Sequence, residues 1–378
     1  MAVLTDEQSM LRDAARIWTQ ERSPVSAFRK LRDGGSELGY DPAAFAEMAE
    51  MGWAGVIIPE AFGGSDFGYL SLGLVLEETG RTLTASPLLA SALAAASALV
   101  LGGSEAQKNA YLPEIAAGRL VGALAVDEGP RHAPSKVALA AARTAGGYSL
   151  SGAKTHVLEG GAAGLFVVSA RTSGVPNDTD GITLFLVPGD ARGLIRKRLE
   201  LVDSRGAANL SFDNVEVSAD AVLGEVGRGW ELLEKILDRA RAGLAAEMLG
   251  AAEQAFEITM DYLKVRVQFD QVIGSFQALQ HRAATMFTDL ELARSCVEAA
   301  LEAIDTDALD AAELVSLAKA KMGDLLHLVS NEMVQMHGGI GMTDEHDAGL
   351  YLKRARAAEA AFGNQSFHRD RYARLNGF

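Results

Sequence analysis

The spacing of apolar residues changes twice along this chain of 378 residues, and that change restricts the possible folds more than any other feature. Before about residue 120 and after residue 223, apolar side chains recur with the 3.6-residue period of amphipathic helices. In between they recur at every second position, with Gly, Asn and Asp at the breaks, as in β-strands. We therefore expect a mainly α protein with a central β domain, in the order α, β, α, and domains at 1–120, 121–223 and 224–378.

The same pattern predicts individual elements. Helices are expected at 5–20, 42–51, 69–82, 88–101 and 104–117, and again at 230–264, 275–304, 311–336 and 348–362. Strands are expected around Leu124, Tyr148, Leu165, Ile182 and Leu210. Residues 147–155 are one residue too long for a phosphate-binding loop, so they are expected to form a hairpin turn. Long C-terminal helices with short connections indicate an antiparallel four-helix bundle.

Composition excludes several classes of partner. The formal net charge is −15, and no stretch collects the lysines and arginines that nucleic-acid binding requires. The most apolar run, residues 87–102, is shorter than the roughly 20 residues that cross a bilayer. Neither a nucleic acid nor a membrane is therefore expected as a partner.

Cysteine content and the first residues bear on the compartment. Cys296 is the single cysteine, which excludes an internal disulfide and a cysteine-based metal site. The run Glu345-His346-Asp347 lacks the spacing of a metal site, so no metal is expected. Residues 1–7 are acidic toward their end and lack the apolar core of a secretory signal. A reducing cytoplasm is the expected location.

Two segments some seventy residues apart suggest a nucleotide. Arg266 offers a planar, permanently charged group that suits a diphosphate. Gly338 and Gly339 end a helical pattern and allow backbone N–H groups to approach a ligand closely. His337, directly before them, is either an ordinary polar helix residue or a group that faces a phosphate. Together the segments predict a site for the pyrophosphate of a dinucleotide.

Several segments resemble the acyl-CoA dehydrogenase family, and the resemblance extends over essentially the whole chain. Residues 58–68 contain a Pro-Glu-x-x-Gly-Gly turn, and residues 77–80 read Glu-Glu-Thr-Gly, like the Glu-Glu-x-Gly helix of the family. Residues 266–269, 273–277 and 335–341 are similar to its flavin-dinucleotide segments. The resemblance implies an acyl-CoA dehydrogenase-like fold.

Membership of this family would imply an FAD-dependent enzyme that removes hydrogens from Cα and Cβ of an acyl-CoA thioester and passes electrons to an electron-transfer flavoprotein. It would also imply a tetramer in which the ADP half of FAD crosses a subunit interface. By matching position, the residues that contact FAD are Arg266, Gln268, Phe269, Phe276, Gln335, Gly338 and Gly339.

The catalytic carboxylate of the family is missing at both positions where its members carry it. Phe362 stands at the position used by the short- and medium-chain members, and Ala240 at the position used by the isovaleryl and long-chain members. Neither side chain accepts a proton, and loss of a positioned base typically costs on the order of 10² to 10⁴ in rate. Glu359, one helical turn before Phe362, and Glu247, two turns after Ala240, are the candidates for a displaced base.

The segments that would hold the flavin ring also depart from the family pattern. Of the Thr-Glu-Pro-x-x-Gly-Ser-Asp loop, residues 127–134 keep only Glu128. The following Lys-x-Trp-Ile-Thr segment has become Lys154-Thr-His-Val-Leu158, so His156 replaces the ring-covering indole and Leu158 a hydroxyl. The ring site is therefore expected to be lost, whereas the residues for the ADP half are kept.

This asymmetry suggests a division of labour between two chains. Some bacterial members of the family, including several that act on steroid side chains, are heterotetramers with one productive flavin site per pair. The leading hypothesis is that this chain is the non-catalytic subunit of such an enzyme. A self-sufficient homotetramer with a displaced base is the second hypothesis. A flavin monooxygenase or oxidase of the same fold, with His156 as the base, is the third.

Overall fold

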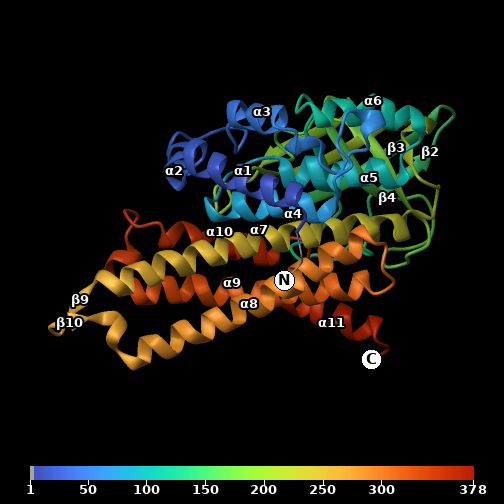
Figure 1. Cartoon of the computed structure of the whole chain (residues 1–378). Coiled ribbons are helices and arrows are strands. Elements are labelled where there is room, and N and C mark those ends of the chain that lie inside the picture. Colours follow the sequence, from blue (N-terminus) through green and yellow to red (C-terminus); the bar gives the residue numbers. More distant parts are fainter. Residues whose placement is uncertain (1–3) are drawn as a thin grey trace. The chain divides into compact units, whose positions relative to one another are not determined.

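The computed structural model describes residues 4–378, and its contacts divide them into two compact units (Figure 1). The helical unit contains the residues up to Arg29, Gly73–Thr84 and Arg241–Phe378. The sheet unit contains Lys30–Leu72 and Ala85–Ala240. The mainly α fold with a central sheet and C-terminal helices is confirmed. The three domain boundaries stay a prediction, and the first three residues of the N-terminal segment lie outside the described residues.

In the helical unit, long helices pack around α9. Its helices are α1 (Asp6–Arg22), most of α7 (Gly229–Val265), α8 (Gln277–Asp305), α9 (Ala311–His337), α10 (Ala348–Ala360) and α11 (Gln365–Leu375). Helix α9 packs against α8, α10 and α11. Met322, Leu326, Val329 and Met333 lie on its buried face at the three- and four-residue spacing of an amphipathic helix.

Glycines let α4 (Gly68–Arg81) and α7 approach each other closely within the helical unit. A Cβ atom added to Gly80 would overlap the carbonyl oxygen of Glu247, and one added to Gly250 would overlap that of Glu77. Two glycines, one on each helix, therefore set the distance between the helices.

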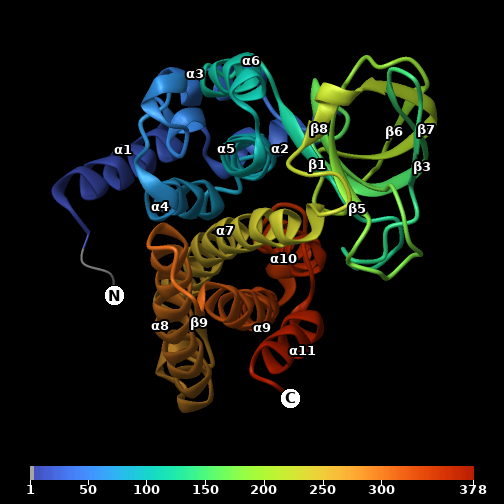
Figure 2. The same ribbon diagram turned by 90° about the vertical axis from the view of Figure 1, so that its right-hand side faces the viewer.

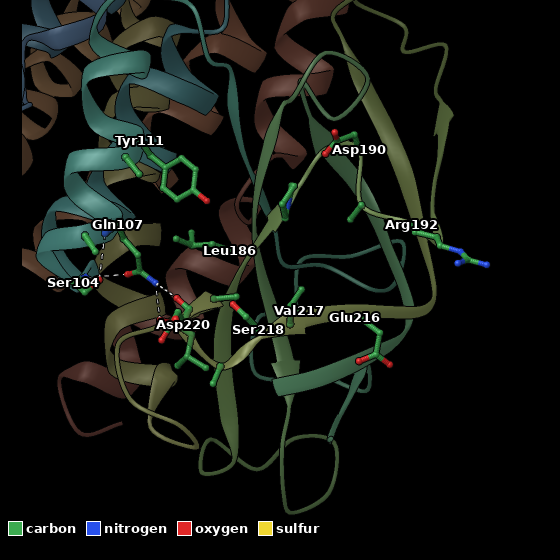
Figure 3. A pocket seen from close by; sticks show the side chains of 18 of the residues that line it. Ser104, Gln107, Tyr111, Leu186, Asp190, Arg192, Glu216, Val217, Ser218 and Asp220 are labelled. Atoms are coloured by element: carbon green, nitrogen blue, oxygen red, sulfur yellow. Dashed lines mark hydrogen bonds between the residues drawn. The ribbon is translucent and has the colours of Figure 1, made fainter. Parts of the chain in front are cut away.

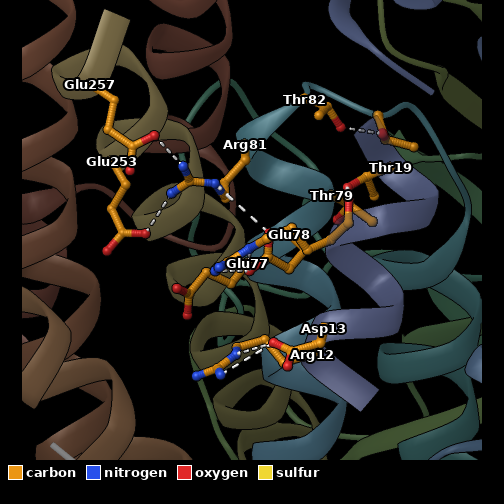
Figure 4. Close-up of polar contacts among 12 residues, drawn as sticks. Arg12, Asp13, Thr19, Glu77, Glu78, Thr79, Arg81, Thr82, Glu253 and Glu257 are labelled. Atoms are coloured by element: carbon orange, nitrogen blue, oxygen red, sulfur yellow. Dashed lines mark hydrogen bonds and ion pairs between the residues drawn. The ribbon is translucent and has the colours of Figure 1, made fainter. Parts of the chain in front are cut away.

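Ion pairs of the buried residues Arg81 and Glu78 surround this contact (Figure 4). Arg81 pairs with Glu253 at 3.0 Å and also with Glu257, while Arg16 of α1 reaches Glu78 at 2.7 Å. Each charge thus has a partner, as buried charges require.

The sheet unit is built on one eight-stranded sheet, which curves in the view of Figure 2. The strand order is β6-β7-β3-β2-β4-β5-β8, and β1 pairs in parallel with β4. The strands are β1 (Gly122–Ala125), β2 (Ala140–Arg143), β3 (Gly147–Leu158), β4 (Leu165–Arg171), β5 (Ile182–Pro188), β6 (Leu194–Arg198), β7 (Ala207–Ser218) and β8 (Val222–Leu223). Every residue of β4 is buried, so this strand lies at the core of the sheet.

Shorter helices complete the sheet unit. They are the residues of α2 (Val25–Asp33) from Lys30 onward, α3 (Pro42–Glu50), the start of α4, η3 (Leu88–Ala95), α5 (Ala96–Gly102) and α6 (Glu105–Ala116). The run 88–101, expected as one α-helix, is a π-helix in η3 that continues as α5. Its eight π-helical residues are all buried, and the N–H of Gly122 in β1 donates to Ser91 Oγ at 2.9 Å.

One interpretation of the sequence, the hairpin turn at 147–155, is wrong. Residues 147–155 do not form a hairpin turn, since they lie inside β3, where a side chain on Gly147 would overlap the backbone of Val217.

Over residues 4–378, no helix combines the length and the apolar character needed to cross a bilayer.

Candidate functional site

The segment that follows α7 forms an exposed hairpin, which projects at the left of Figure 1. Helix α7 ends at Val265, and β9 (Val267–Gln268) pairs with β10 (Gln271–Val272). Phe269 and Asp270 at the turn have φ of 53° and 62°, the left-handed conformation that tight two-residue hairpin turns require. Residues 264–272 are all exposed, and within residues 4–378 the side chain of Arg266 has no ion-pair partner.

Two aromatic rings stand beside this hairpin. Phe269 is 86% exposed, and its ring contacts that of Phe276 edge to face at 6.1 Å. The side chain of Gln268 donates only to the carbonyl oxygen of its neighbour Val267. The predicted cofactor residues of this segment therefore present aromatic, amide and guanidinium groups to solvent.

The glycine pair lies where α9 ends. Gly338 has φ 63° and ψ −136°, a conformation that is essentially restricted to glycine. No atom lies within 4 Å of a Cβ added to Gly338 or Gly339, so these glycines border open space. The Gly338 N–H donates to the carbonyl oxygen of Gln335, whose side chain is exposed. Backbone groups here are accessible to a ligand from outside the chain.

Contacts within the helical unit bring these two segments together. Tyr262 lies one turn before Arg266 on α7, and the Arg266 N–H donates to its carbonyl oxygen at 2.9 Å. The Tyr262 ring packs on the His337 ring, with centroids 4.3 Å apart, and its hydroxyl donates to the His337 carbonyl oxygen at 3.4 Å. Residues distant in sequence thus form one candidate nucleotide surface.

Position 362 lies in a tightly held loop after α10. Phe362 has φ 55°, an unusual conformation for a bulky residue. Its carbonyl oxygen accepts from Arg241 Nε at 3.3 Å and from His368 Nε2 at 3.1 Å. The Lys319 ammonium donates to the carbonyl oxygen of Gly363 at 3.1 Å, and to those of two residues at the end of α10. The loop is therefore fixed by side chains that donate to its backbone.

These donors are deeply buried. Arg241 and His368 are fully buried, and Lys319 is 1% exposed. Burial lowers the pKa of Lys319 to about 7, a shift that Glu359 opposes and Arg241 reinforces. Burial also lowers the pKa of His368, with Arg241 and Lys319 adding to the effect. No carboxylate stands at position 362 to offset these groups.

The other base position and the two displaced candidates have defined surroundings. Ala240 is fully buried. Glu359 accepts from Arg356 at 2.7 Å and contacts His327 Nδ1 at 3.2 Å. Glu247 accepts from Arg354 Nε at 3.0 Å and pairs with its Nη2 at 2.9 Å. An arginine thus engages each candidate carboxylate and occupies Oε1 of Glu359 and Oε1 of Glu247.

In the sheet unit, residues 127–134 form hydrogen bonds among themselves. Asp127 accepts from His132 Nδ1 at 2.8 Å and from the Ala133 N–H at 3.0 Å. Burial raises the pKa of the Asp127 carboxyl, but the hydrogen bond and charge of His132, the Ala133 N–H and the charge of Lys154 together outweigh burial, so the pKa is lowered. The Asp127 carboxylate thus has its hydrogen-bond partners within the loop itself.

The glutamate kept in this loop has a structural partner. Glu128 Oε1 accepts from the fully buried Lys154 at 2.8 Å, and both its oxygens accept backbone N–H groups, those of Ala138 and Leu139. Burial lowers the pKa of Lys154, and Glu128 opposes that shift. The Glu128 carboxylate is thus occupied by the fold of its own chain.

His156 stands at a bulge in β3, where the pairing with β7 shifts between Lys154 and Val157. It has φ 52° and an exposed side chain, and its N–H donates to Asn209 Oδ1 at 3.1 Å. Bulges re-aim side chains, so the imidazole faces solvent and not the strand's buried face.

A separate cavity of about 1180 Å³ lies in the sheet unit between α6 and the β7 region (Figure 3). Gln107 spans its edge and donates to the carbonyl oxygens of Asp220 and Val222. No residue of 127–134 or 154–158 lines it, so it is not the predicted ring site. Across residues 4–378, no group of three potential ligand side chains is placed to bind a metal ion.

Comparisons with known proteins cover the whole chain. Residues 5–119 match the model of the acyl-CoA dehydrogenase N-terminal domain, and residues 227–375 that of its C-terminal domain. The mitochondrial isovaleryl-CoA dehydrogenase of Pongo abelii is 31% identical, over 97% of this chain and 88% of that protein.

Two solved structures are similar over nearly their full length. Butyryl-CoA dehydrogenase from Megasphaera elsdenii has a TM-score of 0.92 at 26% identity, covering 100% of this chain and 99% of the other. A chain of the steroid ACAD Tcur3481-Tcur3483, in variant form, has a TM-score of 0.88 at 30% identity, covering 98% of each.

Proposed function

Because the chain belongs to the acyl-CoA dehydrogenase family of FAD-dependent oxidoreductases that act on acyl-CoA, we propose that it is the accessory subunit of such an enzyme. In this proposal it contacts the ADP half of an FAD whose ring and catalytic base belong to a homologous partner subunit. The observation that carries it is that Phe362 and Ala240 stand where the base is expected, while Arg266 and the glycine pair face open solvent.

The absence of a usable base supports this proposal. FAD accepts a hydride from the substrate, and the accompanying α-proton needs a carboxylate that is both placed and free. Phe362 and Ala240 have no acidic group, and the oxygens of Glu359 and Glu247 already accept from Arg356 and Arg354. This chain alone therefore lacks a residue that is ready to remove the proton.

The loop that would hold the ring supports the proposal as well. Its Asp127 accepts from His132 and Ala133, and its Glu128 from Lys154, so these oxygens are occupied within the chain. Leu158 offers no hydroxyl to a flavin. The Arg266 side chain differs, because within residues 4–378 it has no ion-pair partner that a diphosphate would have to displace, and Gly338 and Gly339 border open space.

The proposed assembly is a heterotetramer with a homologous acyl-CoA dehydrogenase subunit, in the cytoplasm, with an electron-transfer flavoprotein as the electron acceptor. Similarity to a chain of the steroid ACAD Tcur3481-Tcur3483 supports a paired subunit and suggests a steroid acyl-CoA as the substrate class. An alternating arrangement would place the ADP surface of this chain next to the ring site of the partner, so that one FAD serves each pair.

The test is to express the chain alone and together with a homologous subunit encoded beside it, and to measure flavin per chain and acyl-CoA oxidation. We expect little flavin in the isolated chain, and about one FAD per pair with full activity in the assembly. Within the assembly, Arg266→Met should lower flavin content, because it removes the diphosphate contact. Arg192→Met, at an exposed arginine of the sheet unit, is the matched control.

Activity of the isolated chain would contradict this proposal. If that activity were lost in Glu359→Gln or Glu247→Gln, the chain would instead be a self-sufficient dehydrogenase with a displaced base. Oxygen consumption without an electron acceptor, abolished in His156→Phe, would identify a flavin oxidase or monooxygenase.

A further inference from the structure

We propose that His337 is a positioning residue that holds the Arg266 hairpin and the glycine turn against each other, and that it does not itself bind a phosphate. The inference rests on the proposed role of these two segments in contacting the ADP half of FAD. In this proposal the buried ring of His337 keeps the Arg266 hairpin and the glycine turn in fixed positions relative to each other.

The His337 ring contacts two other rings. Its centroid lies 4.3 Å from that of Tyr262 of α7 and 4.2 Å from that of His346. Tyr262 is followed after one turn by Arg266, and His337 is followed directly by Gly338. Movement of the His337 ring would therefore disturb the hairpin on one side and the glycine turn on the other.

Hydrogen bonding fixes the tautomer of His337. Its Nδ1 lies 2.7 Å from the carbonyl oxygen of Met333, which only accepts, so Nδ1 carries the proton. In the neutral ring Nε2 is then a bare acceptor, and it is buried without a partner. Phosphate oxygens are acceptors too, so Nε2 offers nothing to them. The side chain is 3% exposed, which also keeps a ligand from reaching it.

The third ring is anchored independently. The Ala348 N–H donates to His346 Nδ1 at 3.1 Å. Arg29 of α2, which belongs to the helical unit, pairs with Asp347 at 2.7 Å and donates to the Asp344 carbonyl oxygen at 2.5 Å. These bonds hold the turn that carries His346, so one of the two rings that His337 contacts is fixed independently of Tyr262.

Protonation is expected to open the stack. The groups that face the ring are Tyr262, the Met333 carbonyl and His346, and behind His346 stand Asp347 and Arg29. Burial lowers the pKa of His337, and His346 lowers it further. With the folded-state pKa below the unfolded value of about 6.5, the neutral stack is favoured at pH 7 and loses stability as pH falls through that value.

Amide hydrogen exchange on the whole chain tests the positioning role without any ligand. His337→Ala removes the ring, whereas His337→Phe keeps a flat ring between Tyr262 and His346. We expect His337→Ala to speed exchange at both 266–273 and 338–343 by roughly tenfold, and His337→Phe to leave both nearly unchanged. Unchanged exchange at 266–273 in His337→Ala would overturn the proposal.

Binding of ADP measured at pH 7.5 and at pH 5.5 separates positioning from phosphate contact, because the two roles predict opposite effects of His337 on the change in ADP affinity with acidification. If His337 holds the stack, acidification weakens ADP binding several-fold more in the parent chain than in His337→Phe, where only the phosphate of ADP titrates. If protonated His337 contacted the phosphate, binding would strengthen on acidification and His337→Phe would weaken it, which would refute the proposal.

The two measurements also keep this inference distinct from the proposed function. A chain that binds no ADP, and whose Arg266→Met variant leaves the flavin content of the assembly unchanged, would contradict the proposed function. The exchange experiment would still decide whether His337 couples the two segments.

Discussion

Three buried side chains hold the loop where the family carries its base. Lys319, Arg241 and His368 all donate to backbone carbonyl oxygens between α9, α10 and α11, and no carboxylate stands at position 362. Their burial is tolerated because each makes hydrogen bonds to the loop. The loop conformation is therefore kept although the catalytic group is absent, and Phe362 retains a left-handed backbone that a bulky residue rarely adopts.

The first prediction concerns Lys319 and pH. Burial lowers its folded-state pKa to about 7, while the unfolded chain has the usual value of about 10.4. Between these values the unfolded state binds more protons, so stability should rise with pH, by up to about 5 kcal/mol across the window. Urea unfolding at pH 7, 8 and 9 measures this rise.

Lys319→Met is the reference for that experiment. It lacks the titrating group, so its stability should change less with pH, although it is less stable throughout because three carbonyl oxygens lose their donor. Parallel pH curves for the two proteins would show that Lys319 stays charged in the folded state.

Between elements, the contact of α4 and α7 depends on two glycines. Alanine at Gly250 would overlap the Glu77 carbonyl oxygen, and alanine at Gly80 that of Glu247. We predict that Gly250→Ala destabilises the chain by at least about 2 kcal/mol, because the helix backbones must separate. Chemical denaturation measures the loss.

Gly349→Ala is the matched control for Gly250→Ala. Gly349 is also helical, in α10, but a Cβ there meets no atom within 4 Å. The substitution should be neutral or stabilise by about 0.5–1 kcal/mol, because alanine favours helix. Equal losses at both positions would mean that the close approach of α4 and α7 contributes little.

The elements that the sequence pattern predicts are those whose buried faces are apolar. Helices α8 and α9 were expected at 275–304 and 311–336, and they begin and end within two residues of those bounds. Helix α11 was not expected, since its buried residues are His368 and Arg371 and give no apolar period. Strand β6 was missed because Leu194–Arg198 is an exposed, mostly charged edge strand.

The sequence does not show which side chains contact each other at the candidate site. The resemblance to the family identified Arg266 and the glycine pair, but not Tyr262, whose ring joins them. The sequence does not single out Lys319, because its three carbonyl acceptors come from residues 39 to 44 positions later. Likewise, the sequence alone does not show that Lys154 holds Glu128, because the contact forms only in the folded chain.

For the whole molecule, the unexplained feature is the hairpin after α7, because an isolated chain gives no reason for it to expose large apolar side chains. Val265, Val267 and Phe269 are 73%, 54% and 86% exposed, and apolar side chains clustered in this way mark interaction surfaces. Because the proposed assembly shares FAD at this hairpin, burying Phe269 against a partner and binding the nucleotide are expected to depend on each other.

The last prediction therefore tests assembly. Phe269→Asp should shift the complex with its homologous subunit toward smaller species, by a loss of about 2–4 kcal/mol in association, while leaving the thermal stability of the chain nearly unchanged. Light scattering after size exclusion measures the mass. Leu309→Asp is the control, because Leu309 is 107% exposed in the connection after α8, at the end remote from the hairpin. If both variants dissociate to the same extent, the added charge weakens the assembly wherever it is placed, and the hairpin has no special role. If neither variant dissociates, the hairpin lies outside the subunit interface.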